Sequence, residues 1–268
     1  MLRELHLFAG IGGGILAGSL LGFHLVGAVE IDEWCQHVLR SRLGSEVVVG
    51  GDISHFDATS LCGSVDLVAG GFPCEDISLA GKGAGLAGAR SGLWFEMRRV
   101  VEETKPAYVF IENSPALRTR GLGTILRGLA DLGFDAEWSD LRASDVGAPH
   151  IRRRLWILGA HPDRYRRQGI SPQDLCAAWK QEPRRGDAHG LRALVPDAGG
   201  EGFPQWLGTE AEWARAAAAG GSWWFGEPAL GRVADGFPGR VEQVRALGKA
   251  QVPFCAAHAF RRLMERFL

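Results

Sequence analysis

The sequence lacks the features of a membrane protein, of a disulfide-stabilised secreted protein and of a zinc protein. No apolar run is long enough to span a bilayer, and the first residues follow a strand-like pattern rather than the layout of a signal peptide. The five cysteines are an odd number, lie far apart and form no Cys-x-x-Cys pair, which argues against a disulfide framework and a metal site. We therefore expect a cytoplasmic protein without a bound metal.

A strong overall charge is also absent, because the formal net charge is −1. The chain as a whole therefore does not indicate a polyanionic partner. Between His150 and Arg192, however, ten Lys and Arg residues stand against four acids. Arginine suits bidentate contact with phosphate or guanine, yet a charge run is usually a solvated face. Both interpretations of this stretch stay open.

Short apolar runs alternate with helix-like segments through the first 161 residues. Continuous apolar strands of this kind predict a mostly parallel sheet with helices on both faces, an α/β fold. No helix is evident between the last two runs, so we expect them to form an antiparallel hairpin at the sheet edge. The expected strands are 4–9, 24–30, 47–52, 66–69, 107–112, 135–142 and 154–160, and the expected helices are 13–21, 33–43, 92–104 and 122–132.

The texture changes after residue 161. Residues 162–230 are rich in Pro, Gly, Arg and Trp, lack strong periodicity and predict a small, irregular second lobe, with one helix at 210–219. Aromatic side chains among arginines suit base stacking, but they equally suit the core of a small lobe. Residues 252–268 return to a helical pattern. Five of the nine tryptophans lie in this second lobe: Trp179, Trp206, Trp213, Trp223 and Trp224.

One thiol is placed where open α/β sheets keep their active sites. Cys74 follows the apolar run 66–69 and the turn-forming segment 70–73, so a buried strand would deliver it to the carboxyl edge of the sheet. A buried structural cysteine is the alternative. The glycine-rich stretch 81–88 follows directly and predicts a mobile lid or a plain loop.

Glycines and acids follow the first three strands. The glycine loop that starts at Gly10 opens the first helix, and its backbone can approach a ligand closely. Glu30 ends the second strand, where an acid can accept from ribose hydroxyls, and Asp52 ends the third. This pattern favours a site for an adenosine-type ligand over ordinary turn chemistry.

Glu112 and a run of three arginines supply further candidate groups. Glu112 ends a buried strand, where desolvation would raise its pKa and let it act as an acid. Strand alternation would send Arg152 and Arg154 to one side and Arg153 to the other. The first two could hold an anion or the edge of a base, or could simply form a basic sheet edge.

In their order along the chain, these motifs resemble those of the DNA cytosine-5 methyltransferases, especially compact phage-type and prophage-type members. The resemblance covers 1–161 and about 231–268, and residues 162–230 take the place of the family's variable target-recognition region. The matching segments are Phe8-Ala9-Gly10-x-Gly12-Gly13, Glu30, Gly51-Asp52-Ile53, Gly71-Phe72-Pro73-Cys74-x-x-x-Ser78, Gly85-Leu86 with Arg90 and Leu93, Glu112-Asn113, Arg152-x-Arg154 and Gly248-x-x-Gln251-Val252-Pro253.

The resemblance implies a Rossmann-like methyltransferase fold, in which residues 231–268 return to the catalytic domain of residues 1–161. It implies transfer of a methyl group from S-adenosylmethionine to C5 of a cytosine flipped out of double-stranded DNA. Cys74 would add to C6 of the base and Glu112 would protonate or hydrogen-bond N3. Arg154, with Arg152, would hold the base, and Asn113 would orient the loop or the base.

The resemblance also implies binding residues for each substrate. The S-adenosylmethionine contacts would be Phe8, Ala9, Gly10, Gly12, Gly13, Glu30, Ile31, Asp52, Ile53, Pro73, Leu93, Lys249 and Ala250. The DNA contacts would be Ser78, Lys82, Arg90, Arg166, Arg167, Arg184 and Arg185. Lys249 stands where the family has asparagine, so its cation could pair with the methionyl carboxylate or crowd the site.

We expect a monomeric, bacterial or phage-encoded enzyme, whether or not it is paired with a restriction enzyme. Two other functions stay open: the same chemistry on tRNA, and a nucleic-acid-binding relative without catalysis. A nicotinamide-dependent oxidoreductase is disfavoured, because the glycine fingerprint is incomplete and Cys74, Glu112 and the arginines would have no role.

Overall fold

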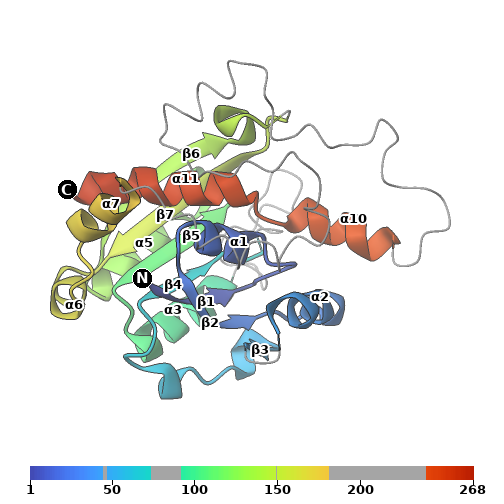
Figure 1. Cartoon of the computed structure of the whole chain (residues 1–268), viewed down its shortest axis with the longest axis horizontal. Coiled ribbons are helices and arrows are strands. Elements are labelled where there is room, and N and C mark those ends of the chain that lie inside the picture. The colour runs from blue at the N-terminus through green and yellow to red at the C-terminus, as the bar shows by residue number, and fades with distance from the viewer. Residues whose placement is uncertain (45–46, 74–91, 149, 181–239) are drawn as a thin grey trace.

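The computed structural model describes residues 1–44, 47–73, 92–148, 150–180 and 240–268. These residues form a seven-stranded sheet in the order β3-β2-β1-β4-β5-β7-β6 (Figure 1). Its strands are β1 (Arg3–Leu7), β2 (His24–Val29), β3 (Val48–Gly50), β4 (Leu67–Gly70), β5 (Tyr108–Asn113), β6 (Asp135–Arg142) and β7 (Arg153–Ala160). The first five are parallel, and β7 runs antiparallel to both β5 and β6. The predicted α/β fold with its antiparallel edge hairpin is confirmed.

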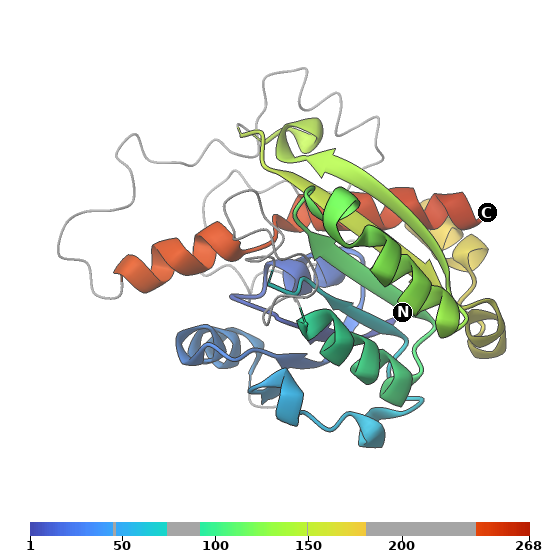
Figure 2. The ribbon, with the colours of Figure 1, turned by 180° about the vertical axis from the view of Figure 1, so that it is seen from behind.

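Helices cover both faces of the sheet. One face carries α1 (Gly13–Leu20), α7 (Pro172–Lys180) and α11 (Pro253–Met264), and the other carries α3 (Leu93–Thr104) and α5 (Leu122–Asp131) (Figures 1 and 2). Within β5, Phe110 packs into the core under α11 and Ile111 packs into the core under α3. Both faces of the central strands are therefore buried, which explains their continuous apolar sequence.

The remaining helices connect strands or lie at the periphery of the sheet. They are α2 (Glu33–Leu43), α4 (Leu117–Arg120), α6 (Pro162–Gln168) and α10 (Arg240–Lys249). Asp32 caps α2 by accepting a hydrogen bond from Cys35 N at 3.1 Å, the contact expected of an aspartate that precedes a helix. The helix predicted over 33–43 thus begins and ends at the predicted residues.

Residues 162–180 belong to the layer that covers the sheet. The second lobe was expected to begin at 162, with no helix before 210, but α7 buries Leu175 and Cys176 in the core. The hydroxyl of Tyr108 donates to Ile170 O at 2.6 Å, and Trp179 Nε1 donates to Leu21 O at 3.3 Å. Trp179 is therefore half-buried against the core. The other four tryptophans and the helix predicted over 210–219 lie outside the described residues.

The C-terminal helix completes the same face. Phe260 of α11 makes edge-on ring contacts with Phe23 and Phe110, at centroid distances of 5.2 and 5.1 Å. These contacts fix the link between α10 and α11 above the ends of the strands (Figure 1). Within the described part of the chain, no helix has both the length and the apolar character needed to cross a membrane.

Candidate active site

The candidate groups gather at one edge of the sheet. The carboxyl ends of β1, β2, β4 and β5 meet there, and the antiparallel β7 brings its amino end to the same edge. This is the edge at which open α/β sheets bind ligands. In the β5–β7 register, Glu112 lies opposite Trp156, so the arginines that precede Trp156 come beside the carboxyl group.

Glu112 is a buried acid with one ionic partner. Its residue is 9 % exposed, and its Oε1 lies 2.7 Å from Arg154 Nε. Burial raises the pKa of Glu112 above its ordinary value, and the guanidinium groups of Arg154 and Arg152 oppose that shift. Because desolvation favours the neutral acid, this carboxyl group is suited to hold a proton and to deliver it to a ligand.

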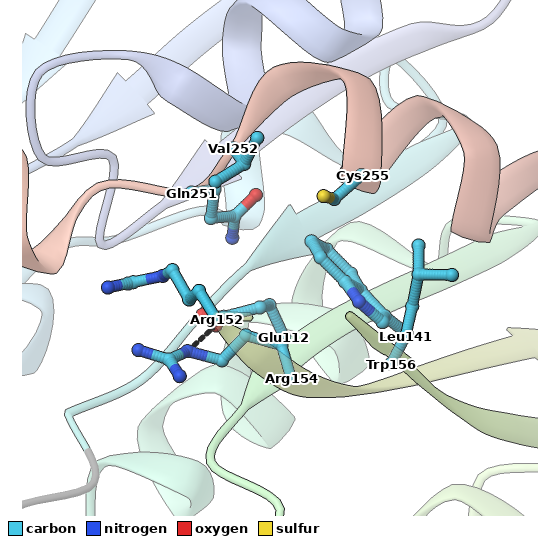
Figure 3. A pocket seen from close by; sticks show the side chains of 8 residues that line it. All are labelled: Glu112, Leu141, Arg152, Arg154, Trp156, Gln251, Val252 and Cys255. Carbon is cyan, nitrogen blue, oxygen red and sulfur yellow. Dashed lines mark ion pairs between the residues drawn. The ribbon is translucent and has the colours of Figure 1, made fainter. Parts of the chain in front are cut away.

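The three consecutive arginines separate as strand alternation predicts. Arg152 and Arg154 both line the pocket beside Glu112 (Figure 3). Arg153 lies on the other side, where its guanidinium contacts Asp140 Oδ2 at 2.8 Å. Arg152 also binds the backbone at the end of α10 and in the link to α11, because it donates to Gly248 O at 2.7 Å and to Ala250 O at 3.1 Å.

Asn113 fastens the loop that leads toward Cys74. Its side chain is buried and donates from Nδ2 to Phe72 O at 3.1 Å. Its Oδ1 accepts from Ser114 N at 2.8 Å, so the amide is held at both ends. The predicted role of Asn113 in orienting the loop therefore has a physical basis, although Cys74 itself lies outside the described residues.

The pocket beside Glu112 continues into an apolar region. It is lined by Glu112, Leu141, Arg152, Arg154, Trp156, Gln251, Val252 and Cys255 (Figure 3). Burial raises the pKa of the Cys255 thiol to about 12, so this sulfur stays protonated near neutral pH and is a poor nucleophile. Cys62 is exposed and precedes β4, at the opposite edge of the sheet.

The ends of β1 and β2 are joined by a carboxylate. Glu30 Oε2 accepts from Gly10 N at 2.6 Å, and its Oε1 accepts from Asp32 N at 2.9 Å. Phe8 has a φ of 54°, which costs a residue with a side chain on the order of 1 kcal/mol. Such strained backbone often occurs at ligand sites. A methyl group on Gly10 would meet no atom of the described residues within 4 Å, so these residues leave space beside the loop.

The neighbouring strand ends add an apolar and an acidic group. Ile31 is 66 % exposed, and a large apolar side chain in this position suits contact with a flat ring. Asp52 accepts from the backbone and the hydroxyl of Ser54, and these hydrogen bonds lower its pKa. An open glycine loop, two strand-end acids and an exposed apolar side chain fit the hydroxyls and base of S-adenosylmethionine.

Other predicted cofactor residues have different surroundings. The side chain of Ile53 packs in the core and Ala9 is also buried, while Leu93 and Pro73 are half-buried. Gly12 has a φ of 90°, a conformation that favours glycine. Lys249 is exposed at the end of α10 and Ala250 follows it.

Of the seven residues predicted to contact DNA, only Arg166 and Arg167 lie in the part of the chain that the structure describes. Arg166 and Arg167 lie on α6, which follows the carboxyl end of β7, so they occupy the sheet edge opposite to Glu112. They therefore do not belong to this site. The other predicted contacts lie outside the described residues: Ser78, Lys82, Arg90, Arg184 and Arg185.

Sequence reasoning missed a buried polar pair in β1. His6 Nδ1 lies 2.6 Å from Glu4 Oε1, and both residues are 2 % exposed. Two polar residues at alternate positions of an otherwise apolar strand were the available signal, because alternation places them on one face. No group of three or more potential metal ligands occurs in the described ranges.

The order of the strands, the strained loop after β1 and the edge-clustered site define a Rossmann-like methyltransferase fold. The family model described as C-5 cytosine-specific DNA methylase matches residues 2–188 of the 268-residue chain. The chain therefore belongs to the C-5 cytosine-specific DNA methylase family.

Individual relatives match a little over half of the chain. The type II methyltransferase M.CviJI of Paramecium bursaria Chlorella virus IL3A is 36 % identical over 163 residues, which are 60 % of this chain and 44 % of the relative. M.PspPI of Psychrobacter sp. strain TA137 is 38 % identical over 164 residues, covering 59 % and 39 %. The chain thus spans less than half the length of these two curated relatives.

A solved structure shares the fold over a similar share of the chain. It is a prophage-encoded Escherichia coli protein, classed provisionally as a DNA modification methyltransferase. Its TM-score is 0.50 at 25 % identity, covering 61 % of this chain and 47 % of that one. The residues that the family model matches include all seven strands and the site at the carboxyl edge of the sheet.

Proposed function

We propose that this protein transfers a methyl group from S-adenosylmethionine to C5 of cytosine in double-stranded DNA. The observation that carries the proposal is the buried Glu112, paired with Arg154 at 2.7 Å, next to the loop that leads to Cys74. A proton donor for the ring and a nucleophile for C6 are the two groups that this chemistry needs. Family membership supports the same assignment.

The reaction begins with the thiolate of Cys74. It adds to C6 of a cytosine that has left the base stack, because C5 and C6 cannot be reached inside the duplex. Glu112 donates a proton or a hydrogen bond to N3, so negative charge does not accumulate on the ring. Arg154 holds Glu112 and offers its remaining N–H groups to the O2 atom of the base.

S-adenosylmethionine supplies the electrophilic methyl group when it is bound. Glu30 and Asp52 would accept hydrogen bonds from its hydroxyl and amino groups, and Ile31 would cover the face of its base. Once C5 carries the methyl group, S-adenosylhomocysteine would remain as the co-product, and water removes the C5 proton. The C6–S bond then breaks and the proton on N3 returns to Glu112, which regenerates the acid and the thiolate of Cys74 and leaves 5-methylcytosine.

Sequence recognition is assigned to residues between α7 and α10. This stretch holds Arg184, Arg185 and four of the tryptophans, and such residues suit phosphate and base contacts. Ser78, Lys82 and Arg90 would contact the DNA backbone near the flipped base. We expect the protein to work as a monomer.

Transfer of labelled methyl groups tests the proposal. Plasmid DNA and tRNA are incubated with the full chain and radiolabelled S-adenosylmethionine, with the Cys74→Ser variant as the control. We expect label in the plasmid, none above background in tRNA, and a loss of at least about a thousandfold in the variant. Label in tRNA alone would show the RNA reaction, and no label in either would contradict the proposal.

A further inference from the structure

The link between α10 and α11 reaches between the two halves of the site. The main chain of Gln251 lies against Gly13, where a methyl group would come within 3.3 Å of Gln251 N. Its side chain lies against two other glycines. A methyl group on Gly14 would lie 2.5 Å from Gln251 Oε1, and one on Gly71 would lie 3.3 Å from Gln251 Nε2. The absence of β-carbons at these glycines leaves the space that Gln251 fills.

Each end of the Gln251 amide lies in the neighbourhood of a polar side chain. A methyl group on Gly71 would lie 2.7 Å from Glu112 Oε2 and 3.3 Å from Gln251 Nε2, so the carboxyl oxygen and the amide nitrogen border the same space. The space beside Gly14 is bounded by His6 Nε2, 2.6 Å from the corresponding position. The other nitrogen of His6 is held by Glu4.

Buried polar groups require partners, and the oxygen of Glu112 that Arg154 leaves open lies in the same pocket as the Gln251 amide. Arg154 engages Oε1 of Glu112, which leaves Oε2 on the side of Gln251. Arg152 binds the carbonyl oxygens of Gly248 and Ala250, so the backbone that carries Gln251 is itself held in place. Figure 3 shows the Gln251 amide directed toward the side of the pocket that holds Glu112.

We propose that Gln251 is a positioning residue for Glu112, and that it links the carboxyl group to the β1 strand through His6. This inference rests on the proposed function. Arg154 and Gln251 would each take one carboxyl oxygen, which fixes the plane of the carboxyl group and the direction of its proton. The segment between α10 and α11 would thus both pack against the glycine loop through the Gln251 main chain and orient Glu112 through the Gln251 side chain.

Two substitutions separate the expected role of the Gln251 side chain from that of its main chain. A Gln251→Met substitution removes the amide and keeps the main chain on Gly13. We expect it to lower the single-turnover methylation rate by about tenfold or more, with the Kd for S-adenosylhomocysteine within twofold of the native value. A Gly13→Ala substitution pushes against the Gln251 backbone, so we expect it to weaken cofactor binding.

The matched control is Gln168→Met, the same chemical change at an exposed position of α6 on the opposite sheet edge. We expect this variant to keep the native rate and affinity. Thermal unfolding of all three variants shows whether a rate loss follows from unfolding. A Gln251→Met rate equal to that of Gln168→Met, or a rate loss explained by weaker cofactor binding, would overturn the inference.

A Gln251→Glu substitution gives a signature that lost packing would not produce. A second carboxylate beside Glu112 favours its protonated form, so we expect the alkaline limb of the rate profile to move up by about one pH unit. Within the described residues, the charged or titratable groups that line the pocket with Glu112 are Arg152, Arg154 and Cys255, and His6, paired with Glu4, lies on the Gly14 side of Gln251. None of these is altered by the substitution.

Carbon-13 NMR of the Glu112 carboxyl group tests the inference independently of activity. Its signal is assigned by its absence in Glu112→Gln, and its titration is followed in the native chain, Gln251→Glu and Gln168→Met. We expect a higher midpoint only in Gln251→Glu. An unchanged midpoint would overturn the contact even if DNA is methylated, and a raised midpoint without methylation would leave Gln251 assigned and the proposed function refuted.

Discussion

Two acids at strand ends of the same sheet have opposite electrostatic surroundings. Asp52, just beyond β3, accepts hydrogen bonds from Ser54, and these lower its pKa. Glu112, at the end of β5, is buried, and desolvation raises its pKa. Asp52 is thereby kept ionised as an acceptor for ligand hydroxyl or amino groups. Glu112 is kept able to carry a proton, so one sheet edge provides both a binding carboxylate and an acid.

The largest effect that we expect at these acids is in Glu112→Gln. The amide cannot deliver a proton, so the methylation rate should fall by about 10²–10⁴-fold. In the proposed reaction Glu112 acts as the neutral acid, so we expect the alkaline limb of the rate profile to fall as pH rises through the raised pKa of Glu112. Single-turnover rates across the pH range measure both effects.

The control for this prediction is Glu102→Gln, on the exposed side of α3. It should keep both the native rate and the native alkaline limb. A Glu112→Gln enzyme with unchanged rate and the same pH profile would show that another group supplies the proton.

A smaller effect is expected on the cofactor side, at Glu30. Replacing it with alanine removes the acceptor for ribose hydroxyls and for Gly10 N, and hydrogen bonds to a charged group contribute about 1.5–3 kcal/mol each. We expect the Kd for S-adenosylhomocysteine to rise about 10–100-fold, with most of the rate recovered at saturating cofactor. Isothermal titration measures the affinity, with Glu33→Ala on the exposed side of α2 as the comparison. A rate that stays low at saturation would place Glu30 in the chemical step instead.

The smallest effect is expected from Ile31→Ser. Its side chain is 66 % exposed, so the unfolding temperature should change little. Loss of apolar contact with the cofactor base should weaken binding by about three- to tenfold. Leu268→Ser, at a residue 62 % exposed at the C-terminus, is the matched change away from the site. Equal affinities in the two variants would remove Ile31 from the cofactor site.

The sheet was predictable because its signal is local. Strands buried on both faces read as uninterrupted apolar runs, and each predicted strand lies within a residue or two of the observed one. The acids and glycines that follow those runs marked the correct edge. In contrast, α6 and α7 are short helices in a stretch rich in basic residues. Their apolar face, which packs against Phe260 through Trp179, was therefore not evident from the sequence.

The finer geometry of the site could not be predicted, since it depends on contacts between distant segments. Arg152 was expected to hold a base, but its guanidinium also binds carbonyl groups about a hundred residues away. Gln251 was part of a matching motif without an assigned role, and only the fold shows it between Gly14 and Gly71. Arg166 and Arg167 were predicted to contact DNA because they belong to a basic stretch. The antiparallel direction of β7 places them instead at the sheet edge opposite to Glu112.

The covalent step is tested most directly with duplex DNA that contains 5-fluorocytosine. Fluorine replaces the proton that must leave C5, so the enzyme stays bonded to the base after methyl transfer. With S-adenosylmethionine present, we predict a complex that survives denaturation, is absent in Cys74→Ser, and carries its modification on the peptide containing Cys74. No such complex, or an equal amount of it with Cys74→Ser, would contradict the account.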